Sequence, residues 1–210
     1  MKAHSLIYPL LSPLRENLIN QPTPGLVYYL KRRICMERKV ESKVVFEGKI
    51  FKVTHDDVFV EKTQAMAKRE IVHHHGGVGM VAFHEGKVLL VKQYRYSVGE
   101  YTLEIPAGKL EQGEDPMLSA IRELEEETGY LAHDVSKLST ILATPGYCNE
   151  HLHIYITKNV TKIEKPRLGD EDEDIEMNWY ELDDCIAMIQ NEQITDAKTV
   201  IGILYLKALM

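Results

Sequence analysis

The sequence predicts an α+β fold in which helices sandwich a mixed β-sheet, with an antiparallel subdomain of strands on its N-terminal side. Short apolar segments separated by turn residues fill the stretch from Val40 to Ile105, as expected for successive strands. One of them, Val88–Val91, is apolar at every position, which is typical of a strand buried on both faces. Helical periodicity is confined to a segment after Asp115 and to the end of the chain, so helices are expected to cover the sheet.

The strands before the first helix are bounded by turn signals. Glu47-Gly48 separates the first two strands, and His84-Glu85-Gly86 indicates a hairpin turn before the buried strand. The predicted ranges, in chain order, are Lys43–Phe46, Ile50–Val60, Ala67–His74, Gly79–Phe83, Lys87–Gln93 and Thr102–Ile105.

The first helix carries its own start and stop signals. Asp115 can serve as its N-cap, Pro116 suits the first helical position, and Gly129 suits a left-handed C-terminal cap. At 3.6 residues per turn, the buried face is expected to hold Met117, Ile121, Leu124 and Thr128.

Three more strands and two helices are predicted after the first helix. Strands are expected at Ser136–Ala143, His151–Thr157 and Glu176–Glu181, the last of them after the acidic segment Leu168–Asp174. Two helices, Asp183–Asn191 and Asp196–Leu209, then end the chain. The second is expected to bury Val200, Ile203, Leu204 and Leu206.

The composition is that of a globular protein with one domain, expected over residues 36–210. Hydrophobic residues make up 44% and charged residues 27%, which is ordinary. A formal charge of −7 argues against a general nucleic-acid binder, which would present a basic surface. No apolar run approaches the roughly 18 residues of a membrane span. Three scattered cysteines fit a reducing compartment, so a cytoplasmic location is expected.

Residues 1–35 differ in composition from the rest of the chain. Prolines interrupt every apolar run, so the uninterrupted core of a signal peptide is missing. A leader that bears arginine and few acidic residues also fits a transit peptide, and this alternative stays open. We expect a poorly ordered extension, with Met36 as the working start.

A cluster of glutamates lies on the first predicted helix. Glu123 and Glu127 are one turn apart, with Glu126 beside them. Like charges at this spacing cost about 0.2–0.5 kcal/mol per pair, and Arg122 can offset only part of this cost by pairing with Glu126. A solvated acidic face is the simplest interpretation of such a run. A hard divalent cation, which prefers oxygen ligands, is the functional alternative.

The spacing around this cluster favours the functional alternative. Gly108 is followed after five residues by Glu114, and after seven more by Arg122-Glu123-Leu124-x-Glu126-Glu127-x-Gly129-Tyr130. This pattern resembles the Nudix box at every defined position. The resemblance implies the Nudix fold, with a loop–helix–loop that holds Mg²⁺ or Mn²⁺ against a diphosphate.

The resemblance also implies roles for the residues of the box. Glu123, Glu126 and Glu127 would be side-chain ligands of the metal, and the carbonyl of Ala107 would be its backbone ligand. Arg122 would orient the glutamates. Gly108, Glu114 and Gly129 would shape and support the box.

Features outside the box resemble the ADP-ribose pyrophosphatase subfamily. They are Pro145, sixteen residues beyond Gly129, and the segments Gln93–Tyr96 and Asp196–Thr199. Carried over by position, Arg95 and Arg69 are candidates to hold phosphate or ribose oxygens, and Glu150 to accept from a ribose hydroxyl. Surface ion pairs are the simpler alternative for the two arginines.

The same subfamily takes its water-activating base from an acidic loop after the box. The segment Leu168–Asp174 lies in the corresponding place, and alignment through Asp174 selects Glu171, with Glu173 as the near alternative. Crowded carboxylates raise one another's pKa, which suits a general base.

The activity implied is Mg²⁺-dependent hydrolysis of ADP-ribose to AMP and ribose 5-phosphate. One alternative is a pyrophosphatase for another nucleoside diphosphate sugar, such as GDP-mannose or UDP-glucose. Another is a non-catalytic module that senses ADP-ribose, although such modules usually lack box glutamates that are all present here. A nucleotide-pool sanitising enzyme fits less well, because it would usually lack the Pro145 feature. The subfamily also implies a homodimer through residues 36–75, with no nucleic-acid or membrane partner.

The expectation for the leader can be tested by truncation. A chain that starts at Met36 should fold and turn over substrate like the full chain, because no packed element is predicted before that residue. Solubility, thermal melting and steady-state turnover of the two chains provide the comparison. Loss of solubility or activity on truncation would show that residues 1–35 pack on the domain.

Overall fold

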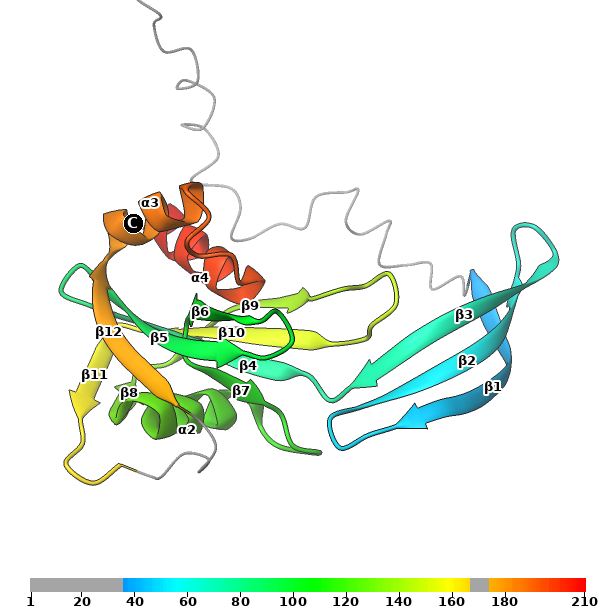
Figure 1. The fold of residues 1–210 in the computed structure, drawn as a ribbon, viewed down its shortest axis with the longest axis horizontal. Coiled ribbons are helices and arrows are strands. Elements are labelled where there is room, and N and C mark those ends of the chain that lie inside the picture. Colours follow the sequence, from blue (N-terminus) through cyan, green and yellow to red (C-terminus); the bar gives the residue numbers. More distant parts are fainter. Residues whose placement is uncertain (1–35, 167–173) are drawn as a thin grey trace, which may run out of the picture.

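The computed structural model describes residues 36–166 and 174–210 and has the predicted α+β architecture. Its centre is a seven-stranded mixed sheet with the order β12-β5-β4-β10-β9, in which β6 pairs with β5 and β7 with β4 (Figure 1). Strands β4 and β10 run parallel, and the other pairs of this sheet run antiparallel. The strands are β4 (Gly77–His84), β5 (Lys87–Arg95), β6 (Glu100–Glu104), β7 (Ala107–Lys109), β9 (Ser136–Leu142), β10 (His151–Thr157) and β12 (Ile175–Glu181).

Strands β4 and β5 diverge beyond their hairpin. They pair only at Phe83 with Val88 and at His84 with Lys87. Farther along, β5 pairs with β6 and β12, whereas β4 pairs with β7 and β10. The chain between β6 and β7 crosses the gap, where the amide of Met80 donates to the carbonyl of Pro106 over 2.8 Å.

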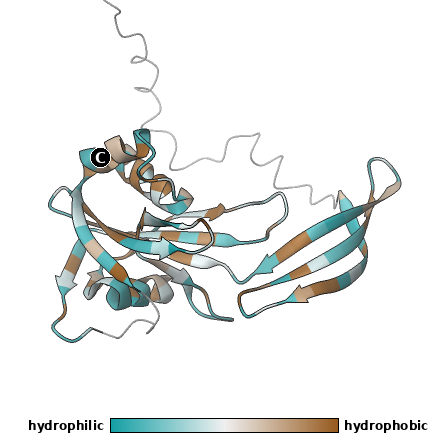
Figure 2. Cartoon of the chain, viewed as in Figure 1, coloured by the Kyte–Doolittle hydropathy of each residue, from teal (hydrophilic) through white to brown (hydrophobic). Residues whose placement is uncertain are grey.

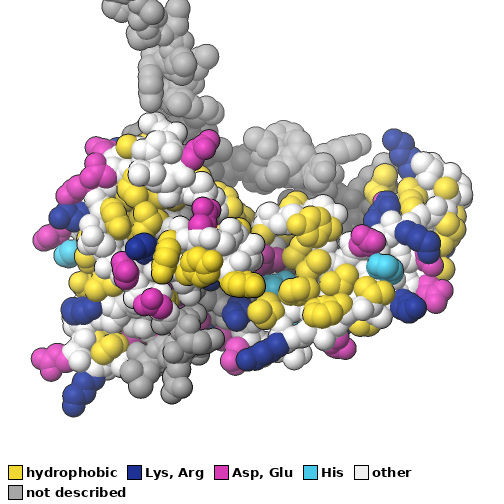
Figure 3. Space-filling view, viewed as in Figure 1, with side chains coloured by type: hydrophobic (Ala, Val, Ile, Leu, Met, Phe, Trp, Pro, Cys, Tyr) yellow, Lys and Arg dark blue, Asp and Glu magenta, His cyan; other side chains and the backbone are white. Residues whose placement is uncertain are grey.

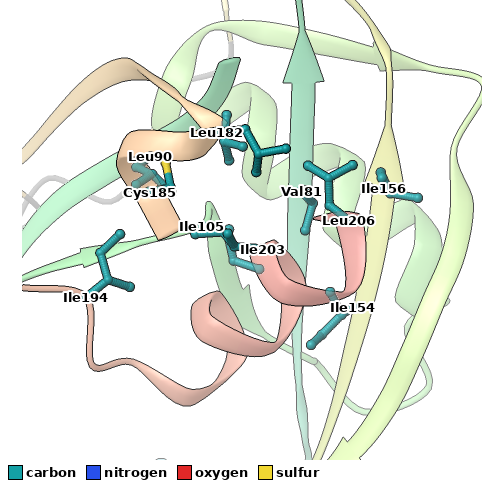
Figure 4. Close-up of a cluster of buried hydrophobic side chains, with 11 residues drawn as sticks. Val81, Leu90, Ile105, Ile154, Ile156, Leu182, Cys185, Ile194, Ile203 and Leu206 are labelled. Carbon is teal, nitrogen blue, oxygen red and sulfur yellow. The ribbon is translucent and has the colours of Figure 1, made fainter. Parts of the chain in front are cut away.

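Helices cover both faces of this sheet. Helix α2 (Pro116–Thr128) lies on one face, and α3 (Leu182–Gln190) and α4 (Ala197–Ala208) lie on the other (Figure 1). Each face has its own buried apolar cluster, and Figure 4 shows the cluster under α3 and α4. Strand β5 contributes to both, because Val88 and Leu90 point to one cluster and Leu89 to the other. The prediction that Val88–Val91 is buried on both faces is confirmed, since each of the four residues is at most 2% exposed. Figure 2 shows the apolar residues along the central strands.

The predicted N-terminal strands form a separate antiparallel sheet that projects from the sandwich (Figure 1). Its strands are β1 (Glu37–Glu47), β2 (Phe51–Val60) and β3 (Ala65–His74). Backbone hydrogen bonds tie β3 to the loop after β9, since Val72 donates to Tyr147 and accepts from Asn149. A small two-stranded sheet, β8 (Tyr130–His133) with β11 (Asn159–Lys162), completes the architecture.

The buried faces of two helices differ in part from the predicted ones. On α2, Leu124 and Thr128 are buried as expected, but Met117 is 39% exposed and Ala120 and Ser119 are buried in its place. These small residues let the helix lie close to the sheet, which turns Met117 in the first turn toward solvent. Ile121 is partly buried against the same cluster.

The buried face of helix α4 also differs from the predicted one because of a small residue. Ile203 and Leu206 are buried and Val200 is partly buried, as expected, whereas Leu204 is 46% exposed and the prediction for it is wrong. A Cβ atom at Gly202 would come within 2.8 Å of Val81, so the absence of a side chain there lets the helix lie close to β4. That contact places Leu204 on the outer side.

The described residues include no helix that is long and apolar enough to cross a membrane.

Candidate active site

The glutamates of α2 are held in place by the two caps of the helix. The Asp115 side chain accepts from the amides of Met117 and Leu118 at 2.9 and 3.1 Å, as an N-cap does. At the other end, Gly129 has φ +68° and donates its amide to Glu125. Both predicted caps are therefore confirmed. A helix fixed at both ends sets the positions of the carboxylates between them.

Arg122 lies at the centre of the acidic cluster. Its Nη1 is 2.8 Å from Glu123 Oε1 and 2.7 Å from Glu126 Oε2, and its Nη2 is 3.2 Å from Glu114 Oε1. Glu114 is also anchored by the amide of Glu111, which donates to it over 3.1 Å. One guanidinium therefore orients three carboxylates but neutralises a single charge.

The surroundings of Glu114 favour its ionised form. Burial by itself raises the pKa of this carboxyl, but the amide of Glu111 and the charge and hydrogen bonds of Arg122 outweigh it and lower the pKa. The carboxylate is thus a fixed, charged support for Arg122.

Strand β7 brings the backbone of Ala107 and Gly108 against this helix. The amide of Ala107 donates to Glu127 Oε2 over 3.1 Å. A Cβ atom at Gly108 would overlap the carboxyl group of Glu123, so this contact requires glycine. The cradle between Gly108 and Glu123 places carboxylate oxygens beside peptide groups, which is the donor chemistry that a hard divalent cation prefers.

A cation held here would need more than side chains. No three His, Cys, Asp or Glu side chains within residues 36–166 and 174–210 converge closely enough to hold an ion by themselves. Mg²⁺ keeps several waters and takes few protein ligands, so carboxylates supplemented by a carbonyl and by waters fit it. The residues that the sequence predicts for the metal therefore suit the group.

A cavity of about 1520 Å³ opens beside this corner. Its walls come from β4, β6, β7, the first turn of α4 and the β1–β2 turn. Seven of the predicted site residues line it: Arg95, Ala107, Gly108, Arg122, Glu123, Glu126 and Glu150. Glu127 lies behind this wall, on the amide of Ala107, and Glu114 and Gly129 support the helix.

Glu150 faces the cavity from the loop that precedes β10. Its Oε1 is 3.3 Å from Nδ1 of His74, the last residue of β3. The amide of His74 in turn donates to the side chain of Asn149 over 2.9 Å. The loop that carries Glu150 is thus fastened to the N-terminal sheet.

Arg69 is not brought to this cavity within one chain. It lies in β3 and pairs with Glu37 of β1, with Nη2 2.5 Å from Oε1. It lies five positions before His74, which lines the cavity, and this is about 17 Å along an extended strand. In its own chain Arg69 has the surface ion pair that was the simpler alternative. The candidate bases Glu171 and Glu173 lie outside the described residues.

A buried polar network behind Arg95 was not predicted in full. Arg95 donates from Nε and Nη2 to the two oxygens of Glu104, each over 2.7 Å. Lys198 also donates to Glu104, and Thr102 does so over 2.6 Å. Burial raises the pKa of the Glu104 carboxyl, but the contacts with Arg95, Lys198 and Thr102 outweigh it and lower the pKa to about 2. Glu104 is therefore ionised although its side chain is only 3% exposed.

The comparison with known families agrees with the box. The model of the NUDIX domain family matches residues 73–200, which include the central sheet, α2, α3 and the first turn of α4. The chain belongs to the Nudix family. Members of this family of hydrolases generally depend on a divalent metal.

Several relatives resemble this Nudix chain over most of its length. It is 40% identical over 176 residues to a methanol dehydrogenase activator of Bacillus methanolicus, covering 83% of this chain and 95% of the relative. It is 38% identical over 172 residues to an ADP-ribose pyrophosphatase of Bacillus subtilis, covering 81% and 92%. A GDP-mannose pyrophosphatase of Citrobacter koseri is 32% identical over 148 residues, covering 66% and 77%.

A solved structure supports the fold. The crystal structure of an ADP compounds hydrolase superposes with a TM-score of 0.73 over 82% of this chain and 93% of that one, at 19% identity. The predicted Nudix fold is thereby confirmed.

The cradle at Gly108 yields a testable prediction. Gly108→Ala should displace the Glu123 carboxyl and lower metal-dependent turnover by roughly a hundredfold, since a displacement of about 1 Å at a site can cost that much. If the displacement is the cause, the double variant with Glu123→Gln should be no slower than Glu123→Gln alone. Steady-state turnover and thermal melting of the three variants test this. Normal turnover of Gly108→Ala at saturating Mg²⁺ would contradict the role of the cradle.

Proposed function

We propose that this Nudix hydrolase cleaves the diphosphate of ADP-ribose to AMP and ribose 5-phosphate, with Mg²⁺ or Mn²⁺ as its metal. The observation that carries the proposal is that one cavity joins the carboxylate corner of α2, the guanidinium of Arg95 and the carboxylate of Glu150. A diphosphate needs the first two groups, and a ribose hydroxyl suits the third. The relative named ADP-ribose pyrophosphatase supports the same substrate.

Each group has a role that follows from its chemistry. Glu123, Glu126, Glu127 and the carbonyl of Ala107 would hold the metal, which when bound polarises phosphoryl oxygens and lowers the pKa of water. Arg95 grips phosphoryl oxygens through its planar donors, and Glu150 accepts from a ribose hydroxyl. We assign the general base to Glu171, with Glu173 as the alternative, by position in the sequence.

Other nucleoside diphosphate sugars are the second candidate class of substrate. Relatives named GDP-mannose pyrophosphatase match as much as 80% of the chain, so another nucleoside diphosphate sugar remains the alternative. A sensing module without activity is disfavoured, since Glu123, Glu126 and Glu127 are all present and held in order.

We further propose that two copies pair through the N-terminal sheet and that the enzyme works in the cytoplasm on small molecules. Within its own chain this sheet buries Thr54, Asp56 and Val58, and it leaves a larger number of apolar side chains exposed (Figure 3). Exposed apolar side chains gathered on one small sheet favour an interaction surface. Those of this sheet and its first turn, each at least 41% exposed, are Val40, Val44, Val45, Phe46, Ile50, Phe51 and Met66.

Sedimentation tests the pairing. The full chain should sediment at twice its own mass, and Phe46→Glu should shift it toward the single chain, because a charge would be buried in the interface. Leu118→Glu, at an exposed site on α2, serves as the matched control and should leave the dimer intact. A native chain that sediments as a monomer at micromolar concentration would refute the proposal.

The substrate is tested by a panel of nucleoside diphosphate sugars with Mg²⁺, with analysis of the products. ADP-ribose should exceed UDP-glucose and GDP-mannose in kcat/KM by at least about tenfold, or roughly 1.4 kcal/mol of transition-state binding. Glu150→Gln should shrink this preference more than it slows the poorer substrates, since polar groups left unpaired discriminate strongly. A preference for GDP-mannose or for a nucleoside triphosphate would overturn the assignment.

A further inference from the structure

The network behind Arg95 joins parts of the chain that lie far apart in the sequence. Arg95 ends β5, Glu104 ends β6, and Lys198 lies in the first turn of α4. The exposed fraction of the side chain falls from 38% for Arg95 to 11% for Lys198 and 3% for Glu104. All three residues line the cavity, but Arg95 is the most exposed to solvent, whereas Glu104 and Lys198 are almost sealed from water.

The hydrogen bonds to Glu104 decide which edge of the Arg95 guanidinium faces the cavity. Glu104 occupies the Nε–Nη2 edge with two bonds of 2.7 Å. A guanidinium has a second pair of parallel donors, on its Nη1–Nη2 edge. Among the described residues, no other group accepts a hydrogen bond from the Arg95 side chain, so this second edge is available for a bidentate contact with a phosphate.

Glu104 alone would weaken this arginine as a ligand for anions. A carboxylate at hydrogen-bonding distance cancels most of the charge of the guanidinium, and the cancellation is strong in a site shielded from water. Lys198 supplies the missing positive charge, because it donates to Glu104 while lying 3.1 Å from Asp196. With Lys198 the four charged groups sum to zero, and without it they would sum to −1.

The lysine is itself held in place by the start of α4. Asp196 caps this helix by accepting from the amide and the hydroxyl of Thr199, at 3.0 and 2.6 Å. The Thr199 hydroxyl accepts from the amide of Ile105, next to Glu104, over 2.8 Å. The position of Lys198 relative to Glu104 is therefore fixed by contacts on both sides.

We propose that Lys198 is a positioning residue for diphosphate binding: it holds and neutralises Glu104, so that Arg95 presents its outer edge and its positive charge to the substrate. The proposal rests on the proposed function in that it takes a diphosphate as the ligand of the cavity, and it adds a residue that acts on the substrate through Glu104 and Arg95. Lys198 strengthens binding of the diphosphate and does not take part in bond cleavage.

Lys198→Met and Lys198→Gln test this role, since both remove the charge and glutamine keeps a hydrogen-bond donor for Glu104. Each should raise the KM for ADP-ribose by about tenfold, while kcat changes less than about threefold. Lys198→Arg, which retains the charge, should restore KM to within about threefold. Lys207→Met is the matched control, because Lys207 lies at the exposed end of the same helix and pairs with Asp183.

Two results would overturn the proposal. One is a KM within twofold of the native value in both neutral variants that fold. The other is a lower kcat and melting temperature at unchanged KM, which is what a purely structural role of the α4 contact would give. If Lys198→Met does not fold, Lys198→Gln alone decides.

A double variant tests whether the effect passes through Arg95. In an Arg95→Lys background a cation still pairs with Glu104, but the planar fork is gone. Adding Lys198→Met there should raise KM less than twofold. An undiminished tenfold effect would show that Lys198 acts on the substrate by another route, and would refute the positioning role.

Calorimetric titration of inorganic pyrophosphate, in the presence of Mg²⁺, separates this proposal from the choice of substrate. The dissociation constant of pyrophosphate should rise about tenfold in the neutral Lys198 variants, whichever sugar nucleotide the native enzyme prefers. Failure of the native enzyme to cleave ADP-ribose would refute the proposed substrate, whereas unchanged pyrophosphate binding would refute the role of Lys198.

Discussion

The close contact between a peptide backbone and a helix carboxylate is the constraint on which the site depends. Glu123 fits only because Gly108 has no side chain, and Ala107 approaches near enough for its amide to reach Glu127. The caps of α2 fix the helix on one side of this contact, and the pairing of β7 with β4 fixes the backbone on the other side. A small change in the packing of α2 on the sheet would therefore affect the acidic corner before it affected the rest of the domain.

The opposite helical layer supplies Lys198 to the charge-balanced network around Glu104. Lys198 on α4 and the ends of β5 and β6 meet where β4 and β5 separate, so the gap in the sheet admits a polar network into the interior. A buried carboxylate is costly unless it is paired and hydrogen-bonded, and Glu104 meets both conditions. One cavity thus receives an excess of carboxylates from α2 and, from the opposite side, a network of balanced charge that includes Arg95.

The sequence predicted the features that are encoded locally. Asp115, Pro116 and Gly129 mark the ends of α2 within a few residues, and the apolar composition of Val88–Val91 predicts its burial.

Strands β7, β8 and β11 are not predicted, because three or four residues are too few to show a period. Met117 and Leu204 were misplaced because tertiary packing at small residues rotates each helix. Glu104 and Lys198, 94 residues apart, meet only through the fold.

The fastening of the N-terminal sheet has a thermodynamic consequence. Val72 of β3 shares backbone hydrogen bonds with Tyr147 and Asn149, and His74 contacts Glu150. The sheet and the wall of the cavity that carries Glu150 are therefore connected directly. A partner that binds the N-terminal sheet and fixes its position therefore also restricts the position of Glu150. Binding is reciprocal: if such a partner changes the binding free energy of a ligand at Glu150, the ligand changes the binding free energy of the partner by the same amount.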